Sequence, residues 1–285
     1  MTPLRTALAD YLALRRSLGY KLERSGKLLN QFVAYCEAIG ADVVTTELAL
    51  AWATLPEGAS RNWAAQRLSV VRCFARYLSF VDDRAQVPPP DVLPGTAHRA
   101  SPYLYSEAEV AALMAAAYRF PSPLRQATLV GLLYVSGMRV GEAIRLDRTD
   151  VDLASALVTV RRSKFGKSRE LAVHTSTVEA LRAYATLRDR YFPSPRTEAF
   201  FVSLAGTRLL YCNFHWAFSA MVAGAGLVRR SPTCRPRPHD LRHSFAVSTL
   251  ISWYADGADI EARLPQLSTY LGHVHPTKGS QTVFA

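Results

Sequence analysis

The sequence of 285 residues has little cysteine and no long apolar run. The longest apolar stretch, residues 127–135, is far shorter than the ~20 residues that a membrane-spanning helix needs. No basic-then-apolar leader precedes Leu4, so we expect a cytoplasmic protein without a membrane partner. The cysteines form no C-x-x-C pair, which argues against structural zinc or a disulfide framework and fits a reducing compartment. They are Cys36, Cys73, Cys212 and Cys234.

Lysine is also scarce: five lysines stand beside 29 arginines. The formal net charge of +11 is unevenly spread, with +2 over residues 1–98 and +9 over residues 99–285. Such a basic excess is typical of proteins with a polyanionic partner, because each phosphate contact releases counterions. A basic surface that only aids solubility is the alternative. Composition therefore favours nucleic acid as the partner, chiefly of the second part of the chain.

Apolar side chains recur at helical spacing through the first part of the chain. One such stripe contains Leu28, Phe32, Cys36 and Ile39, which are predicted to face a core. Similar stripes predict a helical N-terminal domain over residues 1–85.

Prolines then interrupt the helical pattern. Residues 86–102 include Pro88, Pro89, Pro90 and Pro94, which exclude a continuous helix and favour an extended linker. Residues 103–285 are predicted to form a second domain.

The second domain reads as helices with one small hairpin. Ser106 and Glu109 form a capping-box pattern at the start of a helix. Residues 157–161 and 169–173 are predicted to be two short strands with a polar turn between them. Further helices are predicted at residues 122–135, 176–191, 213–223, 240–251 and 264–273. The fold class is therefore mainly α with a small β-hairpin (α+β).

A first candidate for chemistry lies in S-G-M-R-V-G-E, residues 136–142. Gly137 can adopt the left-handed conformation that ends one helix, so that Arg139 sits in an elbow before the next. Glu142, three residues on, is placed to brace Arg139. Taken alone, an arginine in such a turn is usually an ordinary surface residue.

A second candidate is S-K-F-G-K-S-R, residues 163–169, at the tip of the predicted hairpin. Two of the five lysines, Lys164 and Lys167, fall in it. Because lysine gives up a proton more readily than arginine, its choice here hints at acid chemistry. A plain basic turn is the alternative.

A third candidate is H-D-L-R-H-S-F, residues 239–245. Asp240 is a plausible helix N-cap, and His239 and Arg242 would converge near a helix N-terminus, where an anion is favoured. Metal binding by His239 and His243 is a competing interpretation, but no carboxylate or cysteine stands at a helpful spacing.

In order, these segments and the L-G-H at residues 271–273 resemble the tyrosine recombinase (phage integrase) family. The resemblance covers residues ~100–275 and implies a helical core-binding domain followed by a tyrosine-recombinase catalytic domain. It also implies double-stranded DNA as the substrate, a homo-oligomer on DNA that is a tetrameric synapse in the family, and no cofactor or metal. The implied activity is site-specific recombination, integration or transposition of a mobile element.

The resemblance implies a role for five residues. Arg139 and Arg242 would clamp the non-bridging phosphate oxygens. Lys164 would protonate the leaving 5′-oxygen, with Lys167 as the alternative acid. His239 would assist proton removal from the nucleophile, and His273 would hydrogen-bond the phosphate. The attacking tyrosine would form a 3′-phosphotyrosyl link that stores the bond energy.

The nucleophile itself departs from the family's pattern. The family places its tyrosine roughly nine residues after the L-G-H histidine, and no tyrosine follows Tyr270 here. Thr282 stands near the expected place but is a poor substitute, and Tyr270 would normally pack inward. We therefore expect a C-terminally truncated member that is inactive in cleavage as given. A recombinase-derived DNA-binding protein without cleavage activity is the alternative, with a type IB topoisomerase as the third interpretation.

Overall fold

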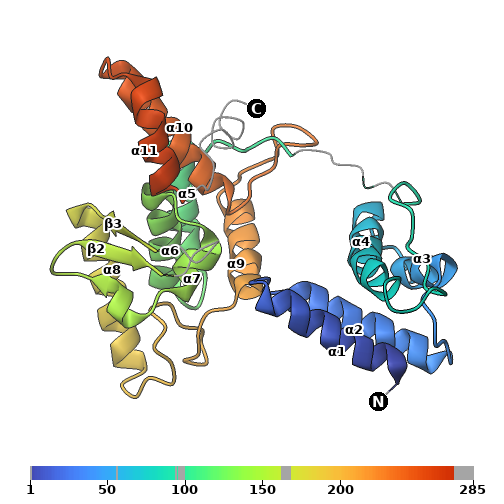
Figure 1. Cartoon of the computed structure of the whole chain (residues 1–285). Coiled ribbons are helices and arrows are strands. Elements are labelled where there is room, and N and C mark those ends of the chain that lie inside the picture. Colours follow the sequence, from blue (N-terminus) through green and yellow to red (C-terminus); the bar gives the residue numbers. More distant parts are fainter. Residues whose placement is uncertain (1, 56, 94, 96–99, 162–167, 273–285) are drawn as a thin grey trace. The chain divides into compact units, whose positions relative to one another are not determined.

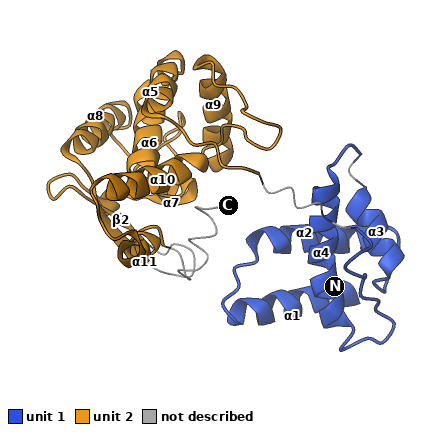
Figure 2. Ribbon diagram, turned by 90° about the horizontal axis from the view of Figure 1, so that it is seen from above, with its two compact units in different colours: residues 1–98 blue, residues 99–285 orange. Residues whose placement is uncertain are grey.

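The computed structural model describes all residues except 1, 56, 94, 96–99, 162–167 and 273–285. The chain divides into two compact units, Met1–His98 and Arg99–Ala285 (Figure 2). Each unit has its own hydrophobic core and is described by itself. None of the helices in the described ranges is long and apolar enough to cross a membrane.

Unit 1 is helical, and three of its helices directly follow a residue whose side chain caps the helix. Side chains of Thr2, Thr45 and Ser60 accept a hydrogen bond from the first turn of the helix that follows. The helices are α1 (Pro3–Ser17), α2 (Glu23–Ala38), α3 (Thr46–Thr54) and α4 (Arg61–Leu78).

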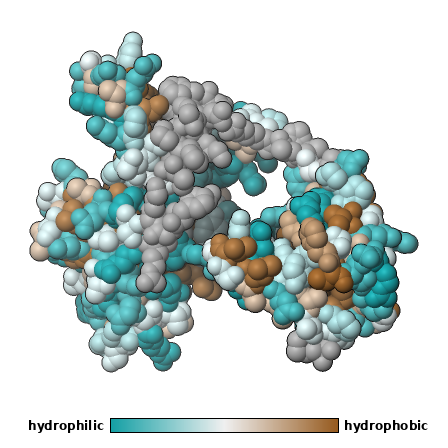
Figure 3. All heavy atoms as spheres, in the orientation of Figure 1, coloured by the Kyte–Doolittle hydropathy of each residue, from teal (hydrophilic) through white to brown (hydrophobic). Residues whose placement is uncertain are grey.

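The core of unit 1 follows the predicted stripes, with one exception. Leu28, Phe32 and Cys36 on α2 are buried as expected. Ile39 was wrongly predicted to join them: α2 ends at Ala38, and the side chain of Ile39 at the C-cap is 53% exposed. On the face shown in Figure 3, the larger hydrophobic patches lie over unit 1. Its exposed apolar side chains include Phe80, which is 84% exposed.

Unit 2 consists of helices around a small antiparallel sheet (Figure 1). Its helices are α5 (Glu107–Ala116), α6 (Pro123–Ser136), α7 (Val140–Arg145), α8 (Thr175–Tyr191), α9 (Tyr211–Gly224), α10 (Asp240–Ala255) and α11 (Ile260–Tyr270), with short 3₁₀ turns at Ala117–Arg119 and Arg148–Asp150. The strands are β1 (Val151–Asp152), β2 (Leu157–Val160) and β3 (Arg169–Ala172), in the order β1-β2-β3. The predicted class, mainly α with a small sheet, is confirmed, and β1 adds a strand that was not predicted.

Helix α6 is the centre of unit 2. It packs against α5, α8 and α10, and most of its residues are buried, including the polar side chains of Arg125, Gln126 and Thr128. Leu129, Val130, Leu132 and Leu133 are fully or almost fully buried on it. Its C-terminal end therefore stands at a fixed place beside α10, where the candidate site lies.

Helices α10 and α11 pack on each other through a small cluster of their own. Ala246 and Leu250 of α10 meet Leu267 of α11 and Leu271 just after it. This contact holds the end of α11 near the first turn of α10, which carries the H-D-L-R segment.

Candidate active site

The elbow between α6 and α7 depends on Gly137. This residue has φ +59°, and a Cβ added to it would lie 2.5 Å from Cδ1 of Phe245 and 2.9 Å from Cδ2 of Leu271. Glycine is therefore required both by the left-handed backbone and by the close approach of α10 and α11. The chain then enters α7 with Arg139 as its N-cap residue.

Arg139 is held by Glu142, as the sequence predicted. Its Nη1 donates to Oε1 of Glu142 at 2.7 Å, and its backbone N–H donates to Oε2 at 3.0 Å. Arg169 at the start of β3 also donates to this carboxylate, from Nη2 to Oε2 at 2.8 Å. Burial alone would raise the pKa of Glu142, but these hydrogen bonds lower it to about 2. The carboxylate is therefore ionised between two arginines.

Arg242 in the first turn of α10 is 5% exposed and ties three segments together. Its Nη1 donates to the carbonyl oxygen of Gly137 at 2.7 Å, and its Nη2 donates to that of Leu271 at 2.5 Å. Burial, followed by the nearby charge of Arg139, lowers the pKa of Arg242 to about 9, so it remains charged at neutral pH. Nη2 of Arg139 also reaches the carbonyl oxygen of Gly272, at 3.4 Å.

His239 directly precedes α10. Desolvation by the surrounding protein, followed by the charges of His243, Arg242 and Arg139, lowers the pKa of His239 to about 4. Its ring is therefore neutral at neutral pH and can accept a proton. Its centroid lies 5.1 Å from that of His243, with the two rings almost perpendicular.

A basic groove of about 430 Å³ extends from His239. One wall is formed by residues of α9, among them Tyr211 and His215, whose rings stack at 6.0 Å. The other wall holds three arginines, Arg229, Arg235 and Arg237. A concave surface with this charge and with flat side chains suits a polyanion.

The structure thus brings together three of the predicted site residues, Arg139, His239 and Arg242, at one end of unit 2. Lys164 and His273, like the alternative acid Lys167, lie outside the described residues.

The comparison with known protein families identifies the chain. A sequence model described as "Phage integrase family" matches residues 104–276, more than half of its length. The chain belongs to the phage integrase family of tyrosine recombinases. A protein of Sinorhizobium fredii named as an integrase/recombinase, y4rB, is 42% identical over 284 residues, which cover 96% of this chain and 90% of that protein.

Solved structures of integrases share the fold of this chain. The Tn1549 transposon integrase, in complex with transposon right end DNA, has a TM-score of 0.62 at 15% identity, covering 99% of this chain and 94% of that one. A lambda integrase tetramer bound to a Holliday junction has a TM-score of 0.60 at 18% identity, covering 98% of this chain and 76% of that one.

One expectation for the H-D-L-R segment of this integrase-family chain is corrected. Asp240 was wrongly predicted to be the N-cap of α10: it is the first helical residue, fully buried, and accepts hydrogen bonds from Nε and Nη2 of Arg237 at 2.9 and 2.7 Å. The charged partner replaces the backbone N–H that a capping side chain would bind. For the metal interpretation, the described residues hold no third His, Cys, Asp or Glu grouped with His239 and His243.

Sequence reasoning gave no role to Arg169, although the structure places it in the cluster. It was noted only as the last residue of the S-K-F-G-K-S-R segment. The signal that could have singled it out is its position: it begins β3, directly after the hairpin turn, and pairs with Val160 of β2. A residue at that register point faces the elbow that carries Glu142.

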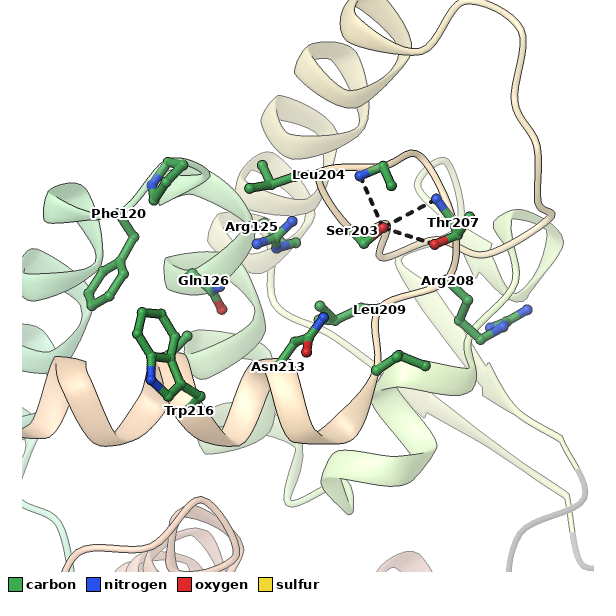
Figure 4. Close-up of a pocket in the computed structure, with 14 residues that line it drawn as sticks. Phe120, Arg125, Gln126, Ser203, Leu204, Thr207, Arg208, Leu209, Asn213 and Trp216 are labelled. Atoms are coloured by element: carbon green, nitrogen blue, oxygen red, sulfur yellow. Dashed lines mark hydrogen bonds between the residues drawn. The ribbon is translucent and has the colours of Figure 1, made fainter.

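A separate apolar pocket of about 560 Å³ lies between the start of α6, the loop before α9 and α9 itself (Figure 4). Phe120, Gln126 and Trp216 line it, and the hydroxyl of Ser203 is used within the loop by Thr207 and by the N–H of Ala205. None of its lining residues belongs to the arginine cluster, so it is distinct from the candidate active site.

Proposed function

We propose that this chain binds duplex DNA and holds one backbone phosphate for strand transfer, as a site-specific recombinase of the integrase type. The observation that carries the proposal is the convergence of Arg139 and Arg242 on the residues directly before His273. Two guanidinium groups side by side, fixed by a carboxylate and by carbonyl oxygens, form a clamp for the non-bridging oxygens of a phosphodiester.

The chemistry of strand transfer matches the other side chains. A tyrosine oxygen attacks the phosphorus, the bond to the 5′-oxygen breaks, and a 3′-phosphotyrosyl link forms. Neutral His239 can take the proton of the tyrosine hydroxyl, and Lys164, or in its place Lys167, can give a proton to the departing 5′-oxygen. His273 would donate a hydrogen bond to the phosphate. The reverse reaction with another 5′-hydroxyl rejoins the strand, so no external energy source enters.

None of these residues supplies the oxygen that attacks the phosphorus. Tyr270 stacks on Phe245 with ring centroids 5.6 Å apart, and burial raises the pKa of its hydroxyl. It is thus a packing residue of α10 and α11 rather than a nucleophile. Residues 271–285 contain no tyrosine. We therefore propose that residues 1–285 clamp the phosphate without forming a covalent link, which equally suits a DNA-binding protein that occupies sites without cutting them.

The partners follow from the same proposal. The Tn1549 integrase was solved with DNA and the lambda integrase as a DNA-bound tetramer, and the basic groove beside His239 provides a surface of the right charge. Double-stranded DNA and further copies of the chain on it are the proposed partners. The helical unit 1 is the proposed core-binding domain, and unit 2 the catalytic domain.

A binding experiment tests the phosphate clamp. A site is selected from random duplexes, and the affinity of Arg139→Ala is compared with that of Arg182→Ala and Arg190→Ala, two exposed arginines of α8. We expect a loss of about tenfold or more for Arg139→Ala, because a charge-assisted bond to phosphate is lost. Equal losses for all three variants, or binding that does not weaken with salt, would remove the proposal.

A second experiment separates the two interpretations of the nucleophile. A nicked suicide substrate with the selected site is incubated with the 285-residue chain and run on a denaturing gel. We expect no covalent band, and a band mapped to Tyr270 or Thr282 would contradict this. The same chain extended by a family-type tail with a tyrosine should then form the band. Failure of that extension despite good binding would favour the dedicated DNA-binding protein.

A further inference from the structure

Arg169 is held inside the site rather than on the surface of the hairpin. It is the first residue of β3, and its side chain is 13% exposed. Nη2 donates to Oε2 of Glu142 at 2.8 Å, and Nη1 approaches Oε1 at 3.4 Å. This two-point contact fixes the plane of the carboxylate as well as its position.

The carboxylate of Glu142 is shared between two arginines. Oε1 accepts a hydrogen bond from Nη1 of Arg139, and Oε2 accepts hydrogen bonds from the backbone N–H of Arg139 and from Nη2 of Arg169. The carboxylate is only 2% exposed, so water is a poor substitute for either partner. The orientation of Arg139 therefore depends on Arg169 through Glu142.

Arg169 also reaches the turn that precedes His273. Its Nη1 lies 3.2 Å from the position that a Cβ at Gly272 would occupy, where the backbone has φ +70°. The same guanidinium thus touches the elbow side and the α11 side of the cluster. It does so from the first residue of β3, which pairs with Val160 of β2.

The neighbouring strand provides a natural contrast. Arg161 directly follows Val160, the residue of β2 that pairs with Arg169. It forms its ion pair with Asp150 instead, and its side chain is 59% exposed. The two arginines stand at the same end of the same sheet, but among the described residues it is Arg169, and not Arg161, that contacts those around the proposed phosphate site.

We propose that Arg169 is a positioning residue for strand transfer. It fixes Glu142, and through Glu142 the guanidinium of Arg139, and it joins the start of β3 to the turn at Gly272. The inference rests on the proposed function, since it assigns Arg169 to the same phosphate site. Arg169 acts through Arg139 and does not itself contact the phosphate.

The test compares a selected duplex with copies in which single phosphates are replaced by neutral methylphosphonates. In the wild-type chain, neutralising the clamped phosphate should weaken binding by about tenfold or more, because charge-assisted bonds are lost. In Arg169→Gln this preference should shrink to about threefold or less, as the remaining clamp is misaligned. Arg169→Lys should restore part of it, and Arg161→Gln should leave it unchanged.

Each other outcome overturns the inference. If Arg169→Gln weakens both duplexes equally, or lowers thermal stability while the preference persists, Arg169 is a general or structural contact. If Arg169→Gln does not fold, Arg169→Lys is measured instead. A phosphate preference of Arg169→Lys equal to that of the wild-type chain would contradict positioning by the two-point contact. If the wild-type chain prefers no phosphate at all, the proposed function fails first, and this inference fails with it.

Discussion

Two arginines of unit 1 differ in their partners from the arginines of the site in unit 2. In unit 1, two arginines lie over aromatic rings: Arg67 is 3.7 Å from the ring centroid of Trp52, and Arg15 is 3.9 Å from that of Tyr20. In the site of unit 2, Arg139 and Arg169 are bound by a buried carboxylate and Arg242 by carbonyl oxygens.

The difference separates two uses of the same residue type. An arginine over a ring gains attraction from the ring and packs as an apolar body, so its charge stabilises local structure. Arginines bound edge-on by acceptors keep a fixed direction and leave their remaining edge for a ligand. The excess of arginine over lysine therefore has no single meaning, and the partners decide the role.

The largest effect should come from the elbow of unit 2. Gly137→Ala introduces a Cβ 2.5 Å from the ring of Phe245 in a left-handed conformation, and we expect a loss of about 4 kcal/mol in the free energy of unfolding. Gly40→Ala in unit 1 has nearly the same φ, +69°, without a described atom within 4 Å, and should cost about 1–2 kcal/mol. Denaturant titrations measure both, and equal losses would show that the close packing contributes nothing.

The next effect concerns the carboxylates that bind arginine. Glu142→Gln leaves two partly buried arginines without their shared anion, and the expected loss is about 3 kcal/mol. Glu37→Gln in unit 1, where Arg5 and Thr2 bind a carboxylate that is 24% exposed, should cost much less. A larger loss for Glu37→Gln than for Glu142→Gln in thermal unfolding would reverse the comparison.

The pH dependence of the same carboxylate has a definite sign. The pKa of Glu142 is about 2 in the folded chain and 4.5 ordinarily. The stabilisation by its charged form is therefore complete above pH ~4.5 and lost as the pH falls through about 2. The stabilities of the wild-type chain and Glu142→Gln should converge over this range in acid-unfolding curves, and a constant gap would contradict the assignment.

A smaller effect is expected from the arginine over a ring in unit 1. Arg67→Met keeps the volume but removes the contact with Trp52 and the hydrogen bond from Nη2 to the carbonyl oxygen of Trp52 at 2.7 Å. Burial already lowers the pKa of Arg67, so part of the loss is offset by the removal of a desolvated charge. We expect a loss of about 1 kcal/mol, with no change in the phosphate preference. A changed phosphate preference would show that unit 1 contributes to the phosphate clamp.

The smallest effect is the pH dependence of DNA binding. The pKa of His239 is about 4 in the free chain, and a phosphate beside it would raise that pKa, so the bound state takes up a proton. Affinity should therefore rise about threefold between pH 7.5 and 5.5. His239→Gln should reduce this rise in affinity. A smaller rise should remain because of His243, whose pKa is also lowered by burial. His174→Gln, at the start of α8, serves as the control and should keep the full rise.

The sequence predicted the parts of the fold that depend on local pattern. The limits of α6 and the capping box of Ser106 and Glu109 follow from periodicity and short-range hydrogen bonding. The pairing of Asp240 with Arg237 was not predictable in the same way, because a nearby guanidinium competed with the backbone for the carboxylate.

The site was predictable where the motifs carry it and not where partners meet through space. Arg139 and Arg242 were found from their motifs, and the brace by Glu142 lies within one helical turn. The hydrogen bond from Arg169 to Glu142 joins β3 to the segment after the elbow, and the two residues are 27 positions apart in the sequence. No periodicity records such a contact, which exists only once β3 and α7 have come together in the folded chain.

The hydrogen bonds of Arg242 link residues that the ribosome makes far apart in time. Its acceptor at Gly137 is 105 residues upstream, and its acceptor at Leu271 is 29 residues downstream. Closing such long loops is slow compared with forming the helices themselves. In a growing chain the elbow at Gly137 is therefore made well before Leu271, and both hydrogen bonds of Arg242 can be present only after Leu271 has been added. In refolding experiments, the phosphate preference should accordingly develop in the slowest phase, after the helical signal has recovered.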